Sequence, residues 1–181
     1  MIAGGRRLNK EEFLDLRTQT VNMESVFTLL ALSSFEKRKL AVIDVKGACL
    51  NADIEAPGGR NTFLKLDPML TELFVDVDQN LRSFVRKGGS LIMRIDKALY
   101  GTLQASYLWQ TELTLELVKL NFCICTYDKC VAINRHSSII LGFHVDDLLV
   151  CASSHGALQG FIERFGKVFT ITKNTGTELD Y

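Results

Sequence analysis

Apolar and polar residues alternate along this chain with two different periods, and the two periods predict helices and strands in different segments. Apolar side chains recur at helical spacing in four segments, which are residues 21–38, a segment that begins at Pro68, about 104–120 and about 155–169. Shorter apolar runs predict strands at residues 40–45, 62–66, 91–95, 122–125 and 131–134. The segment 139–151 is apolar on both sides of its centre, which predicts two further strands there. Helices and strands are therefore expected along the whole chain.

The order of these elements predicts an α+β fold of one domain. The hairpin at 139–151 would lie in the middle of an antiparallel sheet, with the helices packed on one face. Asn22 is placed to cap the first helix, and residues 56–61, Ala-Pro-Gly-Gly-Arg-Asn, form the strongest turn signal. At 181 residues the chain can bury a substantial core, and it contains no internal repeat or low-complexity tract.

Two adjacent acids, Asp146 and Asp147, lie at the centre of the apolar segment 139–151. A hairpin with both acids in its tight turn is the simplest interpretation, although neither Asn-Gly nor Asp-Gly is present there. Two carboxylates between buried strands repel each other and are costly to desolvate, so such a pair usually has a cation nearby. An ordinary solvated acidic turn is the alternative.

A third acid, Asp44, interrupts the apolar run of residues 40–45. A carboxylate within a buried strand has to be paired or coordinated. If this strand lies beside the hairpin, Asp44, Asp146 and Asp147 converge, and three carboxylates select hard ions such as Mg²⁺ or Mn²⁺. Two such ions about 4 Å apart can stabilise the entering and leaving oxygens of a phosphoryl displacement. Residue chemistry alone leaves a polymerase, a nuclease and a phosphatase open.

The composition is that of a globular protein inside a cell. Apolar residues make up 47% of the chain, charged residues 23%, and the formal net charge is zero, which gives no overall electrostatic preference for nucleic acid or a membrane. The five cysteines include no Cys-x-x-Cys pair, and we expect Cys123 and Cys125 on one buried strand face as reduced thiols. No apolar run reaches about 18 residues and residues 1–10 lack a signal-peptide pattern, so we expect a cytoplasmic protein without a membrane partner.

Three motifs resemble those of reverse transcriptases in the form found in copia-type LTR retrotransposons. Residues 143–149, Phe-His-Val-Asp-Asp-Leu-Leu, resemble the catalytic hairpin, and residues 43–51, Ile-Asp-Val-Lys-Gly-Ala-Cys-Leu-Asn, resemble the strand that provides the first catalytic aspartate. Residues 97–109, from Lys-Ala-Leu-Tyr-Gly through Gln-Ala to Trp, resemble the copia-type motif between them. The motifs occur in the family's order, and the resemblance extends over nearly the whole chain.

The resemblance implies an RNA-directed DNA polymerase, a nucleotidyltransferase that adds deoxynucleotides to a primer 3′ hydroxyl by a two-metal-ion mechanism. It implies a polymerase palm with part of the fingers, and Asp44, Asp146 and Asp147 as the catalytic residues and the ligands of Mg²⁺ or Mn²⁺. The implied nucleotide-binding residues are Val45, Lys46, Gly47, Ala48, Cys49 and Gln104. The implied partners are an RNA or DNA template-primer, deoxynucleoside triphosphates and the rest of the retrotransposon polyprotein, with a virus-like particle as a further location.

The sequence departs from the family pattern within two motifs and at both ends. Cys49 stands where the family usually has an aromatic residue that excludes the ribose 2′ hydroxyl, and His144 replaces the commoner tyrosine. We expect residues 1–181 to be a fragment without upstream fingers residues, thumb or RNase H, and therefore inactive by itself in primer extension. Two other interpretations stay open. One is a catalytically silent transposon remnant that binds a partner or has no function, and the other is a metal-dependent nuclease or phosphatase.

Overall fold

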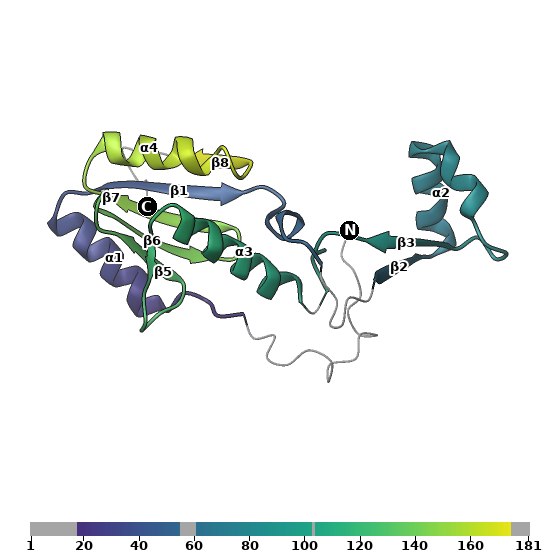
Figure 1. Ribbon diagram of the computed structural model, residues 1–181, viewed down its shortest axis with the longest axis horizontal. Helices are drawn as coiled ribbons and strands as arrows, with labels where there is room; N and C mark the ends of the chain where they lie inside the picture. Colours follow the sequence, from purple (N-terminus) through teal and green to yellow (C-terminus); the bar gives the residue numbers. More distant parts are fainter. Residues whose placement is uncertain (1–17, 55–60, 103, 175–181) are drawn as a thin grey trace.

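The computed structural model describes residues 18–54, 61–102 and 104–174 of the chain. Within these residues the helices are α1 (Met23–Phe35), α2 (Pro68–Val77), α3 (Ala105–Lys119) and α4 (His155–Phe165) (Figure 1). The strands are β1 (Lys39–Val45), β2 (Thr62–Leu66), β3 (Leu91–Ile95), β4 (Cys123–Ile124), β5 (Val131–Asn134), β6 (Ile139–His144), β7 (Asp147–Ala152) and β8 (Ile171–Asn174). The α+β class predicted from the sequence is confirmed. The predicted turn at 56–61 falls, except for Asn61, outside the described residues.

Six strands of the described chain form one antiparallel sheet in the order β4-β5-β6-β7-β1-β8. β6 and β7 form the predicted hairpin, in which Ile139 lies opposite Ala152 and His144 opposite Asp147. β1 pairs with the other edge of β7 and is itself flanked by β8. The hairpin and β1 are therefore neighbours within the sheet, as the proposed convergence of the three aspartates requires.

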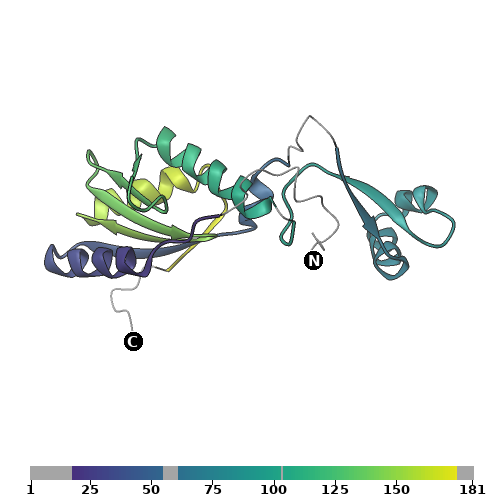
Figure 2. The same ribbon diagram turned by 90° about the horizontal axis from the view of Figure 1, so that it is seen from below.

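The main hydrophobic core lies between this sheet and the two helices α3 and α4, which cover one of its faces (Figure 2). Trp109, Leu113 and Leu117 follow each other at intervals of four residues and are all buried, which explains why this segment forms an amphipathic helix. In α4, Phe161 stacks on Phe165 with 5.2 Å between ring centroids. These buried side chains belong to the same core cluster as those of the central strands, which they cover from one side.

The helix α1 lies across the opposite face of the sheet (Figure 2). Its close approach depends on Gly142 in β6, because a Cβ atom there would lie only 3.0 Å from Leu29 Cδ1. Asn22 occupies the predicted N-cap position but its side chain makes no capping hydrogen bond. Its backbone N–H instead donates to Asp128 Oδ2 at 2.9 Å. Thus α3 and α4 lie on one face as predicted, whereas the prediction that the helices share one face is wrong for α1, which packs on the other face (Figure 2).

The segment from β2 to β3 forms an arm that projects from the main sheet (Figures 1 and 2). β2 and β3 pair antiparallel, and Leu66 and Leu91, opposite each other, are both buried. Helix α2 begins as predicted, with Pro68 in its first turn and the Asp67 carboxylate accepting the Leu70 N–H at 2.8 Å. The arm thus has a small core of its own.

The structure differs from the sequence predictions in three local respects. Helix α4 ends at Phe165 rather than near 169, since Phe169 turns back into the core and lies edge-on to Trp109. Strand β8 was not predicted, because residues 171–174 carry a single apolar residue and are recruited by pairing with β1. Two short 3₁₀ helices, Ala48–Asn51 and Gln79–Phe84, were also not predicted.

The expected burial of Cys123 and Cys125 is wrong. β4 is a two-residue strand at the edge of the sheet, where Cys123 is exposed and Cys125 is half-buried. All five cysteines lie in the described residues and are free thiols. No helix in the described ranges is long and apolar enough to cross a bilayer.

Candidate active site

The three predicted aspartates lie at one end of the neighbouring strands β1 and β7. Asp44, the second-last residue of β1, is directly opposite Asp147, the first residue of β7. Asp146 precedes Asp147 in the hairpin turn, and its carbonyl oxygen accepts the N–H of Val45 at 2.9 Å. The pairing of β1 with the hairpin therefore brings together acids that are about a hundred residues apart in the sequence.

The alternation of side chains across the strands puts Asp44 and Asp147 on the sheet face opposite the main core. Ile43 and Val45, on either side of Asp44, are buried in that core. Because directly opposed residues share a face, the register gives a row of four side chains across four strands: His144, Asp147, Asp44 and Thr172. Asp44 is half-buried and the other three are exposed. The acids of these strands thus lie on an accessible face, and the main core packs against the opposite face of the sheet.

The carboxylates of Asp44, Asp146 and Asp147 repel one another. Burial of part of its surface raises the pKa of Asp147, and the charges of Asp146 and Asp44 raise that pKa further, while His144 lowers it. Three neighbouring carboxylates therefore disfavour full ionisation of Asp147. A cation bound beside them would remove this penalty.

The donor set fits a hard divalent cation in its chemistry, since all three side chains supply carboxylate oxygens. In the described part of the chain, however, no group of three His, Cys, Asp or Glu side chains is already arranged as a metal-binding cluster. The backbone brings the acids together, and their side chains would have to turn toward a common point to bind an ion.

The hairpin turn differs from the predicted one. Its two central residues are Val145 and Asp146, whereas Asp147 already belongs to the β7 ladder. Val145 has φ +53°, which is unfavourable for a β-branched residue. Asp146 is not among the residues of positive φ, so the φ signs match a type II′ turn, in which glycine is the usual first residue. The acids therefore occupy one turn position and one strand position.

The residues that the resemblance assigns to nucleotide binding are unequally accessible. Lys46 and Gly47 follow β1 and are exposed, whereas Val45, Ala48 and Cys49 are at most 1% exposed. Gln104 is 2% exposed, and neither atom of its side-chain amide has a hydrogen-bond partner within the described residues. The sequence did not predict this division, which depends on tertiary packing. Nucleotide contact by these six residues stays a prediction.

A residue for which the sequence analysis proposed no function, Tyr100, lies close to Cys49 and Asp146. Burial raises the pKa of Tyr100 to about 12, and the charges of Cys49 and Asp146 add to this effect. Burial also raises the pKa of the Cys49 thiol, a hydrogen bond with Tyr100 lowers it, and Asp146 raises it. Tyr100 is 37% exposed, whereas Cys49 is fully buried. Its position inside the motif 97–109 is the signal that could have identified it.

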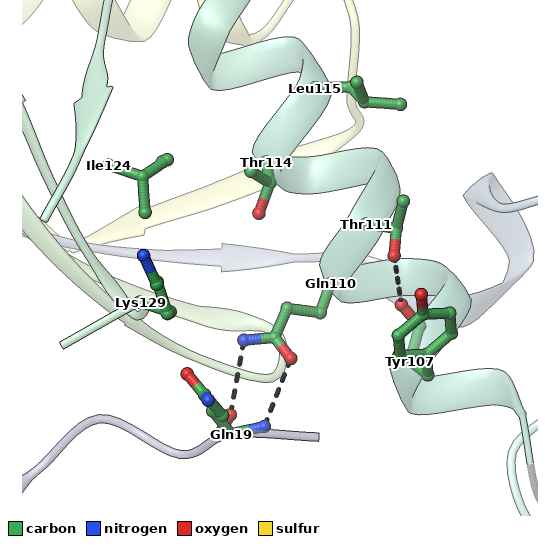
Figure 3. A pocket seen from close by; sticks show the side chains of 8 residues that line it. All are labelled: Gln19, Tyr107, Gln110, Thr111, Thr114, Leu115, Ile124 and Lys129. Atoms are coloured by element: carbon green, nitrogen blue, oxygen red, sulfur yellow. Dashed lines mark hydrogen bonds between the residues drawn. The ribbon is translucent and has the colours of Figure 1, made fainter. Parts of the chain in front are cut away.

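A surface groove of about 470 Å³ lies elsewhere, along α3 (Figure 3). The Gln110 side-chain amide crosses it, accepting the Gln19 N–H at 3.2 Å and donating to the Gln19 carbonyl oxygen at 3.4 Å. None of the three aspartates lines this groove. The carboxylates belong to an open sheet face and not to this hollow.

Comparison with known proteins adds two findings. The protein-family model described as reverse transcriptase (RNA-dependent DNA polymerase) matches residues 1–177 of the chain. The chain is also similar to the retrovirus-related Pol polyprotein from transposon TNT 1-94 of Nicotiana tabacum, with 26% identity over 151 residues. The aligned region is 81% of this chain and 10% of that polyprotein. The chain thus spans about a tenth of the length of this curated relative.

Proposed function

We propose, from the premise that the chain belongs to the reverse transcriptase (RNA-dependent DNA polymerase) family, that Asp44, Asp146 and Asp147 form its catalytic centre. The two matches confirm the resemblance to copia-type retrotransposon reverse transcriptases. The observation that carries the proposal is the register in which Asp44 lies opposite Asp147, beside the turn that contains Asp146. The proposed reaction is templated transfer of a deoxynucleotide to a primer 3′ hydroxyl, within a retrotransposon polyprotein.

The three aspartates would hold Mg²⁺ or Mn²⁺. Two such ions, when bound, would stabilise the oxygens that enter and leave the transferred phosphorus. The chain's own contribution is to present carboxylates on a rigid sheet, where their repulsion raises the pKa of Asp147 and favours binding of a cation. Three of the four side chains in the row from His144 to Thr172 are exposed, which leaves this face open to a primer end. This arrangement supports the proposals that the reaction depends on metal ions and that the site is of the polymerase palm type.

The side-chain amide of Gln104, which is unpaired within the described residues, supports the proposal that this residue contacts the nucleotide or its template base. A buried amide without hydrogen-bond partners costs free energy, on the order of 1–3 kcal/mol for each unsatisfied group. Both polar atoms of the Gln104 side chain are in this situation within the described residues. A nucleobase edge offers a donor and an acceptor and would satisfy them. The exposed Lys46, next to β1, would balance phosphate charge in the same complex.

Cys49 is proposed to lie at the position that distinguishes deoxyribose from ribose. Its thiol is buried and hydrogen-bonded to the exposed Tyr100, so a larger residue at position 49 would displace its neighbours, Tyr100 among them. In an active polymerase that contains this segment, Cys49→Phe should raise the preference for deoxynucleotides over ribonucleotides, because a bulky group excludes the 2′ hydroxyl. The ratio of the two kcat/KM values measures this preference. An unchanged ratio would show that position 49 does not contribute to sugar selection.

Thermal unfolding with and without metal tests the shared site. In the presence of a chelator, Asp147→Asn and Asp44→Asn should each raise the melting temperature, because each removes one of the repelling charges. The corresponding gain in the free energy of unfolding is about 1 kcal/mol. Across a Mn²⁺ titration the parent should be stabilised progressively, because the ion binds only the assembled site, and the two variants much less.

Asp76→Asn, at an exposed carboxylate on α2, is the matched control and should respond to Mn²⁺ as the parent does. Equal metal responses in the parent and both site variants would contradict a shared metal site. That outcome would favour the alternative of a catalytically silent remnant.

A further inference from the structure

The turn that carries the catalytic acids is held in place by a side chain outside the acidic cluster. The indole Nε1–H of Trp109, in α3, donates a hydrogen bond of 2.6 Å to the carbonyl oxygen of Val145. Val145 is the residue with φ +53° that immediately precedes Asp146 and Asp147. A β-branched residue leaves this conformation unless its surroundings hold it there. The hydrogen bond to Trp109 is such a constraint.

The second residue of the turn is also held, from the other side. The Asp146 carbonyl oxygen accepts the Val45 N–H at 2.9 Å, one residue beyond Asp44. The two consecutive carbonyl groups of the turn are therefore bound by α3 and by β1. Because peptide units are planar, fixing both carbonyl groups also fixes the backbone from which the Asp146 side chain projects.

Trp109 is itself immobilised. Its side chain is 1% exposed, and its ring lies edge-on to Phe169 with 5.2 Å between centroids. Phe169 is followed by Thr170, whose carbonyl oxygen accepts the Lys46 N–H at 2.9 Å. The indole is thus wedged between the turn and the segment that leads from α4 to β8. A buried indole N–H needs an acceptor, and here that acceptor is a carbonyl group of the turn itself.

We propose that Trp109 is a positioning residue, whose indole N–H keeps the Val145–Asp146 turn in the conformation that presents Asp146 and Asp147 beside Asp44. The purpose of this hydrogen bond rests on the proposed function, whereas its existence and its effect on the turn do not. Trp109→Phe removes the N–H and keeps an aromatic ring, so Val145 would relax toward a common backbone conformation. Asp146 would then move away from its position beside Asp44 and Asp147.

The first test needs no variant and no metal. Trp109 is the single tryptophan of the chain, so the protein gives one indole N–H signal in a ¹H–¹⁵N spectrum. We expect that signal to exchange with solvent deuterium at least a hundredfold more slowly than in the unfolded chain, because the group is buried and hydrogen-bonded. An indole N–H that exchanges as fast as in the unfolded chain would overturn the proposal.

The second test compares Trp109→Phe with Leu117→Ala, a core truncation two turns further along α3. Backbone chemical shifts of residues 145–147 should change in Trp109→Phe and stay at parent values in Leu117→Ala. With Mn²⁺ as the probe, Trp109→Phe should raise the apparent Kd by roughly fivefold to tenfold, which corresponds to the loss of one hydrogen bond. Leu117→Ala should leave the Kd unchanged at a temperature where all variants are folded.

Rescue provides the third readout. Glycine adopts positive φ without strain, so adding Val145→Gly to Trp109→Phe should restore the Mn²⁺ affinity. Equal weakening by Trp109→Phe and Leu117→Ala, or no recovery with Val145→Gly, would overturn the positioning role. If the parent shows no Mn²⁺ binding that depends on the aspartates, the proposed function fails. Indole exchange and the chemical shifts then decide the proposal about Trp109 by themselves.

Discussion

Replacing Asp128 by asparagine should destabilise the chain substantially, because this carboxylate joins α1 to the turn before β5. Asp128 is 4% exposed. Its Oδ2 accepts the Asn22 N–H and its Oδ1 accepts the Cys130 N–H, both at 2.9 Å. The Ser25 hydroxyl also donates to it. The side chain thus holds the N-terminal end of α1 against the sheet.

The magnitude follows from these contacts. An asparagine amide can accept one of the two backbone N–H groups, but its NH₂ group would face the other donor. The loss is one hydrogen bond to a charged group, about 1.5–3 kcal/mol, together with the charge assistance of the second. We therefore expect a loss of about 2–3 kcal/mol, or a fall of about 4–12 °C in Tm for a chain of this size.

The pH dependence has a definite sign. Burial raises the pKa of Asp128, but the hydrogen bonds from Ser25, Asn22 and Cys130 lower it more, and the net pKa lies below the usual 3.8. A carboxyl whose folded pKa is depressed stabilises the fold above its unfolded pKa, and this contribution is lost as the pH falls through the folded value. The difference in the free energy of unfolding between the parent and Asp128→Asn should therefore be constant from pH 7 to 5 and shrink below about pH 4.

Urea unfolding at pH 7, 5, 4 and 3 measures this gap, with Asp76→Asn as the control at an exposed carboxylate. The control should remain within about 0.5 kcal/mol of the parent at pH 7. A gap below 1 kcal/mol at pH 7, or one that is as large at pH 3 as at pH 7, would refute the assignment of Asp128 as an ionised anchor.

Two further predictions concern packing and thiol chemistry. Gly142→Val should lower the free energy of chemical unfolding by about 1–3 kcal/mol, because its side chain would collide with Leu29. Gly160→Ala, where nothing lies within 4 Å of the added Cβ, should instead stabilise α4 by up to about 1 kcal/mol. Equal effects of the two substitutions would contradict the contact between α1 and Gly142. In alkylation at pH 8 read by peptide mass spectrometry, the exposed Cys123 should react first, and Cys130 should stay protected, since burial raises its pKa to about 11. Labelling of Cys130 as fast as Cys123 in the folded chain would show that it is not buried.

The local elements of this protein were determined by short-range patterns in its sequence. The helical spacing of Trp109, Leu113 and Leu117 predicted α3, and Pro68 predicted the start of α2. The apolar segment around two acids predicted the β6–β7 hairpin. The three catalytic candidates were found the same way, because a carboxylate inside an apolar run is conspicuous without any knowledge of the fold.

Tertiary structure alone decided how these pieces face one another. The pairing of Asp44 with Asp147, the recruitment of β8 and the approach of α1 to Gly142 each depend on residues far apart in the chain. The burial of Cys49 and the hydrogen bond from Trp109 to Val145 depend on the same long-range packing. Periodicity reports which face of an element is apolar, and it carries no information about which distant element covers that face or at which register two strands pair. Those choices depend on the free energy of the whole packed arrangement.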